Sequence, residues 1–152
     1  MHPRLWRFAY GLTRRHAAAD DLTQATCLRA LEKARLFKKD TSADRWIFTI
    51  CRRIWLNDLR AQKIRLGAGV IPAQECDLRA KNCDPVQNIF ATEVFNKVMA
   101  LPDAQRETVL LTYVEGFSYK DTAAILDIPI GTVMSRLSAA RKALAALNKD
   151  DE

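Results

Sequence analysis

The sequence lacks any apolar run long enough to cross a membrane, and its first residues lack the continuous apolar segment of a secretory signal. A spanning helix needs about 20 apolar residues in succession. We therefore expect no membrane insertion and no secretory signal, and we predict a cytoplasmic protein. Apolar residues still make up 49% of the 152 positions, enough for one ordinary domain or two small ones with a buried core.

The sequence also lacks the motifs of common enzymes. It contains no glycine-rich phosphate loop and no nucleophile elbow, and its two histidines, His2 and His16, have no acid or nucleophile at a suggestive spacing. Asp20 and Asp21 are adjacent, so their side chains diverge on a helix and cannot form a catalytic pair. We predict that the protein is not an enzyme and that it needs no metal or other cofactor.

Cysteine is scarce, with four residues in the chain. Cys27 and Cys51 fall in helical patterns and are expected to be small core residues. Cys76 and Cys83 are separated by six residues without a histidine nearby, so a zinc site is not indicated. Reduced cytosolic thiols are the favoured interpretation. A redox role for Cys76 and Cys83 is the weaker alternative, and unchanged activity of a Cys76→Ser, Cys83→Ser variant would dismiss it.

Residues 118–142 predict two short helices joined by a tight turn. Ser118 is suited to the N-cap of the first helix, and Asp121 is at the acidic position of a capping box. Asp127 lies at the turn, where Asp can adopt a left-handed backbone, and Pro129 suits the entry to a second helix. The second helix has a predicted buried stripe at helical spacing, formed by Ile130, Val133, Leu137 and Ala140.

This pattern is typical of a helix-turn-helix, whose second helix enters the major groove of DNA. The alternative is an ordinary helical hairpin. Between Ile130 and Lys142 the helix has three basic residues and no acid. The residues expected to face DNA are Gly131, Thr132, Met134, Ser135, Arg136, Ser138 and Arg141.

The positive charge, however, is concentrated in the other half of the chain. Residues 1–61 contain 13 basic and 6 acidic residues, a net charge of +7, whereas residues 87–152 contain 7 basic and 9 acidic residues, a net charge of −2. A DNA-binding protein with only a C-terminal helix-turn-helix should concentrate its positive charge there. The distribution therefore predicts a second polyanion contact in the N-terminal half.

A predicted helix over residues 42–63 supplies a surface for that contact. One side is apolar and is formed by Trp46, Ile47, Ile50, Cys51, Ile54 and Trp55. The other side has four arginines and is formed by Arg45, Thr49, Arg52, Arg53, Leu56 and Arg60. The acids that usually balance such a face are absent from it, since Asp44 is near the helix start and Asp58 is expected on the apolar side. We predict nucleic-acid binding by this face; the alternative is an ordinary solvated face.

The remaining pattern predicts an all-α fold. Further helices are expected at residues 5–13, 18–34, 86–100 and 103–114, the last closed by Gly116. Asp20 and Asp21 are expected in the first turn of their helix, where carboxylates favour the helix dipole. The predicted core of these helices is Leu5, Phe8, Ala9, Leu12, Leu22, Ala25, Thr26, Leu28, Leu31, Ile89, Phe90, Val94, Val98, Met99, Val109, Leu110, Leu111 and Val114. Residues 64–85 lose periodicity and indicate a flexible linker, so we expect two small helical domains at 1–63 and 86–149.

With both halves in view, the sequence resembles the extracytoplasmic-function group of bacterial sigma factors over nearly its whole length. The C-terminal half resembles region four of that family and the N-terminal half resembles region two. The region-four motifs are Leu101-Pro102 with Gln105-Arg106, Gly116-Phe117-Ser118-Tyr119, Ile128-Pro129-Ile130-Gly131-Thr132-Val133 and Ser135-Arg136-Leu137. The region-two motifs are Ala19-Asp20-Asp21-Leu22-Thr23-Gln24 and Trp46-Ile47-Phe48-Thr49-Ile50, followed by Arg52 to Arg60.

The resemblance implies a protein that binds core RNA polymerase and directs it to promoters, under the control of an anti-sigma factor. By position, Asp20, Asp21 and Gln24 would face the polymerase clamp. The region-four helix would contact the upstream promoter element as duplex DNA. The strand of the downstream element that is exposed by melting would lie against Arg45, Thr49, Arg52, Arg53, Asn57 and Arg60, with Trp46 either beside them or in the core.

Several positions depart from the family pattern. A basic residue is common where Met134 and Ala139 are found, so Arg136 and Arg141 must provide more of the upstream contact. The chain also starts later than many members, so an initial helical stretch is expected to be missing. The other departures are Arg53, where Asn is common, Asn57, where Asp is common, and Ala25, where an acid is common.

Two alternative functions are an ordinary helix-turn-helix regulator and a sigma-like decoy that binds only an anti-sigma protein. The first does not explain the basic helix at residues 42–63, and copurification with core polymerase would distinguish the two interpretations. The second predicts loss of the arginines that face DNA. Those arginines are all present, at positions Arg45, Arg52, Arg53, Arg60, Arg136 and Arg141.

Overall fold

The computed structural model describes residues 2–40, 42–66 and 88–150 of the 152-residue chain. These residues form helices and short turns without a strand, which confirms the predicted all-α fold. The predicted linker from residue 67 onward lies outside the described residues, as do Cys76 and Cys83. Of Ile89 and Phe90, two predicted core residues, only the backbone is described.

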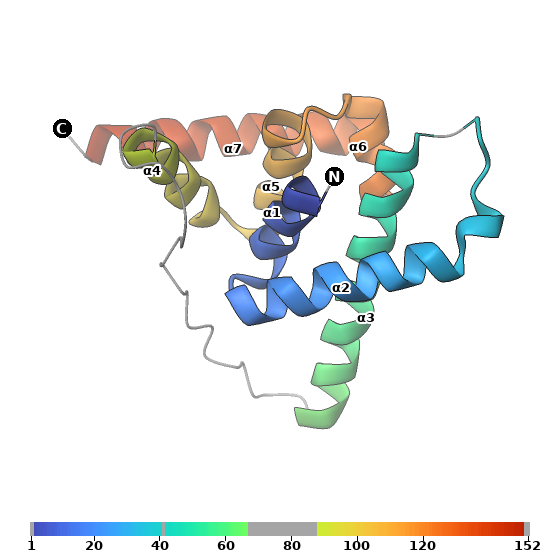
Figure 1. Cartoon of the computed structure of the whole chain (residues 1–152). Coiled ribbons are helices and arrows are strands. Elements are labelled where there is room, and N and C mark those ends of the chain that lie inside the picture. Colours follow the sequence, from blue (N-terminus) through green and yellow to red (C-terminus); the bar gives the residue numbers. More distant parts are fainter. Residues whose placement is uncertain (1, 41, 67–87, 151–152) are drawn as a thin grey trace. The chain divides into compact units, whose positions relative to one another are not determined.

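The chain divides into two compact units, Met1–Cys76 and Asp77–Glu152. The N-terminal unit contains α1 (His2–Thr13), α2 (His16–Glu32), a 3-10 turn (Ala34–Leu36) and α3 (Ala43–Leu66), as Figure 1 shows. Helix α3 therefore continues three residues beyond the predicted end at residue 63. The prediction that the linker starts at residue 64 is therefore wrong, because residues 64–66 are still helical.

The core of the N-terminal unit forms where α1 packs on α2 and α3. Leu5, Phe8, Ala9 and Leu12 are all buried, which confirms the predicted stripe of α1. The Phe8 ring contacts the Phe48 ring of α3, with centroids 5.2 Å apart. Two buried threonines of α2, Thr23 and Thr26, donate their hydroxyl protons to backbone carbonyls one turn earlier, at 2.7 Å each. Their hydroxyl groups are therefore paired within the apolar core.

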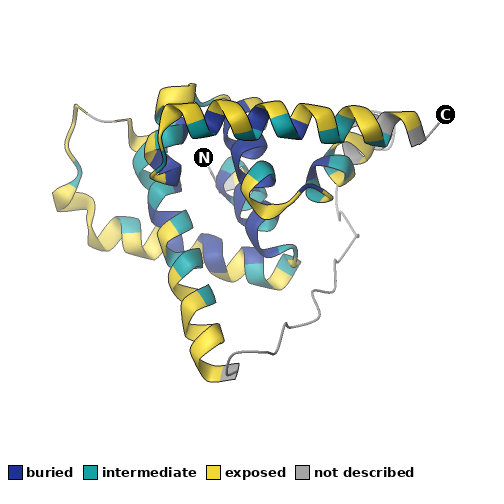
Figure 2. Ribbon diagram, turned by 180° about the vertical axis from the view of Figure 1, so that it is seen from behind, coloured by how far each residue is buried: buried dark blue, intermediate teal, exposed yellow. Residues whose placement is uncertain are grey.

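The second half of α2 differs from the prediction. Leu28 and Leu31 are 60% and 76% exposed, and Cys27 is exposed too, although all three were expected in the core. Figure 2 shows the exposed residues along this part of the helix. The periodicity identified an apolar side of α2, but burial also requires a neighbouring element, and the buried residues of α2, Ala19, Leu22, Thr23 and Thr26, all precede Cys27.

One other expectation for this unit is wrong. Helix α2 begins at His16, so Asp20 and Asp21 lie in its second turn, one turn too late to cap its N-terminus. Asp58 is exposed, but it lines the cavity between α2 and α3 with Trp55, on the side of α3 where it was predicted. Phe48, for which no side of α3 was predicted, is fully buried.

The C-terminal unit contains α4 (Asn88–Met99), α5 (Asp103–Val109), a π-helical turn (Leu110–Val114, η2), α6 (Tyr119–Leu126) and α7 (Ile130–Asp150). Its buried apolar residues include Val98, Leu101, Val109, Leu110, Leu111, Ile125, Leu126, Val133, Leu137 and Ala140. Val94, predicted in the core, is 46% exposed. Gly116 ends the π-helical turn with φ +78°, the left-handed backbone that glycine adopts without strain.

The helix-turn-helix forms as its local signals predict. The Ser118 hydroxyl accepts a hydrogen bond from the backbone N–H of Asp121 at 3.0 Å, and so caps α6. Asp127 has φ 55° and ψ 49°, and this left-handed residue reverses the chain between α6 and α7. The two helices bend by 102°, within the range of helix-turn-helix motifs. One expectation is wrong: Ile130 is 50% exposed, so the buried stripe of α7 begins at Val133.

In the described part of the chain, no single helix is long and apolar enough to cross a membrane, and only the bent pair α6–α7 passes by length and composition.

Candidate nucleic-acid interfaces

Helix α7 separates a packed side from a polar side. Val133, Leu137 and Ala140 are completely buried, and this fixes the rotation of the helix about its axis. The other side is open, and Met134 there is 53% exposed. The structure places all seven predicted DNA-facing residues outside the packed stripe: Gly131, Met134, Ser135, Ser138 and Arg141 are exposed, and Thr132 and Arg136 are half-buried.

The open side of α7 is cationic. Arg136, Arg141 and Lys142 lie on this helix, and its residues 130–147 contain no acid. Two acids of the same unit, Glu107 and Glu115, are instead buried, with 8% and 7% exposure. Residues 130–147 of α7 are therefore locally cationic, although the C-terminal half has a net negative charge.

Helix α3 displays the second predicted surface. Arg53, Asn57 and Arg60 are exposed, and Arg45, Thr49 and Arg52 are half-buried. Residues at this spacing line one side of an α-helix, so the structure aligns the four arginines along α3. The Thr49 hydroxyl donates to the carbonyl of Arg45 at 2.7 Å, so its proton is already paired.

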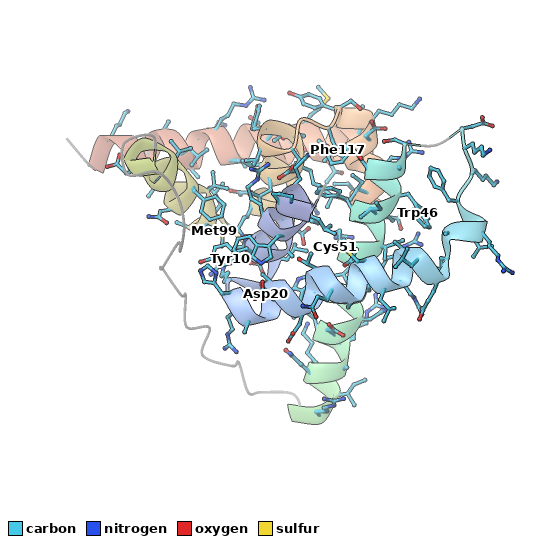
Figure 3. All side chains as sticks on the ribbon, in the orientation of Figure 1. Tyr10, Asp20, Trp46, Cys51, Met99 and Phe117 are labelled. Atoms are coloured by element: carbon cyan, nitrogen blue, oxygen red, sulfur yellow. The ribbon has the colours of Figure 1, made fainter. Side chains whose placement is uncertain are left out.

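Trp46 lies at the edge of this surface, near the start of α3 (Figure 3). It is half-buried, and its ring contacts the Phe37 ring at 5.2 Å. Phe37 follows the 3-10 turn after α2. Trp46 thus helps to hold the start of α3 against that segment and keeps part of its ring accessible.

The acidic residues of α2 have different neighbours. Asp20, Asp21 and Gln24 are all exposed. Asp20 accepts a hydrogen bond from the indole Nε1 of Trp6 at 2.7 Å. Asp21 instead lines a cavity of about 360 Å³ between α2 and α3, together with Trp55 and Asp58. The two neighbouring carboxylates therefore point to different surroundings.

The Trp6–Asp20 contact was not predicted from the sequence. The Trp6 ring stacks on Tyr10, with centroids 5.4 Å apart and planes 9° from parallel. The ring of His16 lies against both, at 5.4 Å from Trp6 and 5.0 Å from Tyr10. Figure 3 labels Tyr10 and Asp20 of this cluster. The spacing of Trp6 and Tyr10, four residues apart on α1, indicates a stacked pair, but no local signal links it to Asp20.

The described cysteines differ in environment. Cys51 is fully buried, and burial is the main cause that raises its pKa from 9.0 to about 12. Cys27 is exposed. Among residues 2–40, 42–66 and 88–150, no group of three or more histidine, cysteine or acidic residues is arranged to hold a metal ion.

Comparison with known proteins identifies the family. Residues 1–64 match the family described as Sigma-70 region 2, and residues 93–144 match Sigma-70, region 4. The ECF RNA polymerase sigma factor EcfG of Rhodopseudomonas palustris (strain TIE-1) is 35% identical over 147 residues, covering 95% of this chain and 79% of that protein. The chain belongs to the extracytoplasmic-function (ECF) sigma factors.

Other ECF sigma factors are similar over much of their length. SigC of Mycobacterium tuberculosis is 34% identical over 152 residues, covering 97% of this chain and 79% of that protein. Among solved structures, the sigma factor RpoE in complex with the anti-sigma factor NepR from Bartonella quintana has a TM-score of 0.75 and 31% identity, covering 99% of this chain and 93% of RpoE. CnrH, in complex with the cytosolic domain of CnrY, has a TM-score of 0.69 at 23% identity, a likeness of fold alone.

The function follows from membership of this family. The ECF sigma factor binds core RNA polymerase and directs promoter-specific initiation of transcription. The match of residues 1–64 to region 2 favours this function over that of an ordinary helix-turn-helix regulator, which would leave the arginines of α3 without a role.

Proposed function

We propose that this sigma factor divides promoter recognition between two helices. Helix α7 contacts the upstream element as duplex DNA, and the cationic side of α3 holds the downstream strand after melting. The observation that supports this division is the alignment of Arg45, Arg52, Arg53 and Arg60 along α3, in the unit that does not contain the helix-turn-helix.

Energetics require such a second contact. Opening a DNA duplex costs about 1.4 kcal/mol of free energy for each base-pair step. The two strands therefore pair again unless the exposed strand is bound. Cations that follow the backbone and aromatic rings that stack on bases stabilise a single strand without needing a particular sequence. The four arginines supply the cations, and Trp46 supplies an aromatic ring beside them. Thr49 and Asn57 add polar groups along the same side of α3.

At the upstream element, α7 fits the major groove. Arg136 and Arg141 provide charge for phosphates or guanines. Ser135 and Ser138 are small and exposed, so they allow the helix to approach the base pairs closely. Thr132, Gly131 and Met134 lie nearest the N-terminus of α7, the end that a helix-turn-helix directs at base edges.

The remaining contacts are with proteins. Asp20, Asp21 and Gln24 form an exposed polar surface on α2 that faces the polymerase clamp, and the indole of Trp6 fixes one oxygen of Asp20. An anti-sigma factor controls access to these surfaces; the similarity to RpoE, solved in complex with NepR, supports this regulation. The protein acts in the cytoplasm and contributes binding rather than catalysis.

The test separates strand binding from duplex binding. Replacing Arg52 and Arg53 together by alanine should reduce promoter opening in the polymerase complex, measured by permanganate reactivity of unpaired thymines, more than it reduces binding to closed duplex promoter. Arg136→Ala should weaken duplex binding at the upstream element, by roughly 1–3 kcal/mol if it contacts a base. The matched control is Arg29→Ala with Lys33→Ala, which removes two charges from exposed positions of the same unit.

Three results would contradict the proposal. Equal loss of opening and duplex binding in the Arg52, Arg53 variant would place those residues on duplex backbone. No change in upstream affinity for Arg136→Ala would remove that residue from the interface. A purified chain that binds an anti-sigma factor but not core polymerase would be a decoy.

A further inference from the structure

The first turns of α7 expose two apolar side chains at the end of the helix that is proposed to contact DNA. Ile130 and Met134 are 50% and 53% exposed, one helical turn apart. Gly131 has no side chain, and a Cβ placed there would meet no atom within 4 Å. The Ser135 hydroxyl donates to the carbonyl of Gly131 at 2.8 Å, so its proton is paired within the helix.

The rotation of α7 gives this apolar pair a defined place. With about 100° between successive residues, Ile130, Met134 and Arg141 fall along one edge of the open side. Gly131, Ser135, Ser138 and Lys142 fall along its middle. The first three are small, which allows the N-terminal part of the helix axis to come close to a partner, so side chains at the edge reach past it.

The charge of α7 indicates which partner that is. Arg141 shares the edge with Met134, and residues 130–147 contain no acid. A single exposed apolar residue is ordinary on a protein surface. Here, two of them lie on a cationic helix whose packed side is completely buried, so they face the same partner as Arg141. That partner is a polyanion with apolar groups on its surface.

Duplex DNA has one apolar group on its major-groove edge, the C5-methyl of thymine. We propose that Met134, with Ile130 beside it, contacts thymine methyl groups in the upstream element and so determines part of its sequence. This inference rests on the proposed role of α7 in duplex binding. It assigns Met134 a base preference that differs from that of the basic residue common at this position in the family.

The experiment removes single methyl groups from the DNA. Upstream elements are first obtained by mapping the start sites that core polymerase with this sigma factor uses on genomic fragments. Each thymine is then replaced in turn by deoxyuridine, which differs only in lacking the methyl group, and the affinity of the holoenzyme is measured. At one or two thymines the wild-type affinity should fall about three- to fivefold, as expected for one methyl group no longer buried.

The variants assign that effect to the side chain. Met134→Ala should be insensitive to deoxyuridine at those thymines, and Met134→Leu, which keeps an apolar side chain, should remain sensitive. Tyr113→Ala is the matched control because it removes another large, exposed side chain of the same unit, 54% exposed, from the π-helical turn rather than from α7, and it should keep the wild-type sensitivity.

Four outcomes would overturn the inference. They are equal sensitivity of wild type and Met134→Ala, no sensitivity at any thymine, upstream elements without A·T pairs, and a Met134→Ala variant that loses affinity for core polymerase or an anti-sigma factor but not for DNA. The last outcome would make the apolar pair a protein-binding surface. If neither Arg136→Ala nor Arg141→Ala weakens upstream binding, the proposed duplex contact of α7 itself fails, which is a separate result.

Discussion

Burial of Cys51 makes the stability of the N-terminal unit dependent on pH in the alkaline range. Burial is the main cause that raises the pKa of the thiol from 9.0 to about 12. A hydrogen bond with Thr26 lowers the pKa, and the neighbouring Cys27 raises it. The native thiol therefore keeps its proton at a pH where the unfolded chain releases it. This contribution to stability is fully present below pH 9 and is lost progressively as the pH rises toward 12.

The size of the effect follows from the two pKa values. Between pH 8 and pH 10 the free energy of unfolding should fall by about 1.4 kcal/mol because of this one group. Cys51→Ala removes the titrating group. Its packing defect lowers stability at every pH, but it does not add a pH dependence. The difference in stability between wild type and Cys51→Ala should therefore shrink by that amount over the same range.

Tryptophan fluorescence provides the assay, because all three tryptophans, Trp6, Trp46 and Trp55, lie in the N-terminal unit. Urea unfolding of wild type and Cys51→Ala at pH 8, 9 and 10 gives the difference directly. Cys27→Ala serves as the control, since that cysteine is exposed and its removal should leave the pH dependence of the wild type nearly unchanged. A stability difference between wild type and Cys51→Ala that stays constant from pH 8 to 10 would refute the reasoning.

Three further predictions concern single substitutions. Gly116→Ala should lower the stability of the C-terminal unit by about 1 kcal/mol because of its φ of +78°, whereas Gly131→Ala, in a helix with open space around it, should raise it by about 0.5 kcal/mol; thermal unfolding followed by circular dichroism measures both. Leu137→Ala should lower the stability of that unit by about 3 kcal/mol, since the side chain is completely buried; retention of the wild-type midpoint would mean that α7 is not anchored there. Trp6→Phe keeps an aromatic ring but removes the N–H that donates to Asp20, and it should weaken binding to core polymerase about two- to threefold; in an Asp20→Ala background, which lacks the acceptor, it should have no further effect.

Much of the fold could be predicted from local chemistry. The Ser118 cap, the left-handed Asp127 and the positive φ of Gly116 each depend on one residue and its immediate neighbours, and the structure has all three. The buried stripe of α1 could also be predicted, because its four apolar residues share one face of the helix, and all four are buried. Local rules predicted these features because the interactions that form them are local.

The errors occur where an apolar face depends on a distant element. Leu28, Leu31 and Ile130 have the spacing of core residues, yet they are exposed because no described part of their unit covers them. No side of α3 was predicted for Phe48, because its burial depends on the ring of Phe8, 40 residues earlier in the chain. The π-helical turn at Leu110–Val114 also lacked a signal, because the sequence continues the apolar pattern of an ordinary helix.

The candidate site shows the same division. The helices that present the predicted residues could be identified from periodicity, and none of the residues expected to face DNA lies in the packed stripe of α7. The Trp6–Asp20 hydrogen bond could not be identified, because it joins two helices across 14 residues of sequence. Ile130 was equally hard to interpret, since periodicity alone does not separate an exposed apolar residue at the edge of a stripe from a core residue.

Placement of charge, rather than its total, explains how a C-terminal half with a net charge of −2 can bind duplex DNA. Glu107 and Glu115 are buried, and Asp103 pairs with the buried Arg106 at 2.6 Å. Asp121 is in the first turn of α6, where a carboxylate favours the helix dipole. Glu107 and Glu115 are thus withdrawn from the surface, and Asp103 and Asp121 interact within their own helices, whereas Arg141 and Lys142 are exposed on α7. Screening by salt limits electrostatic attraction to about 10 Å, so a phosphate near α7 is attracted by those local cations rather than by the net charge of the half.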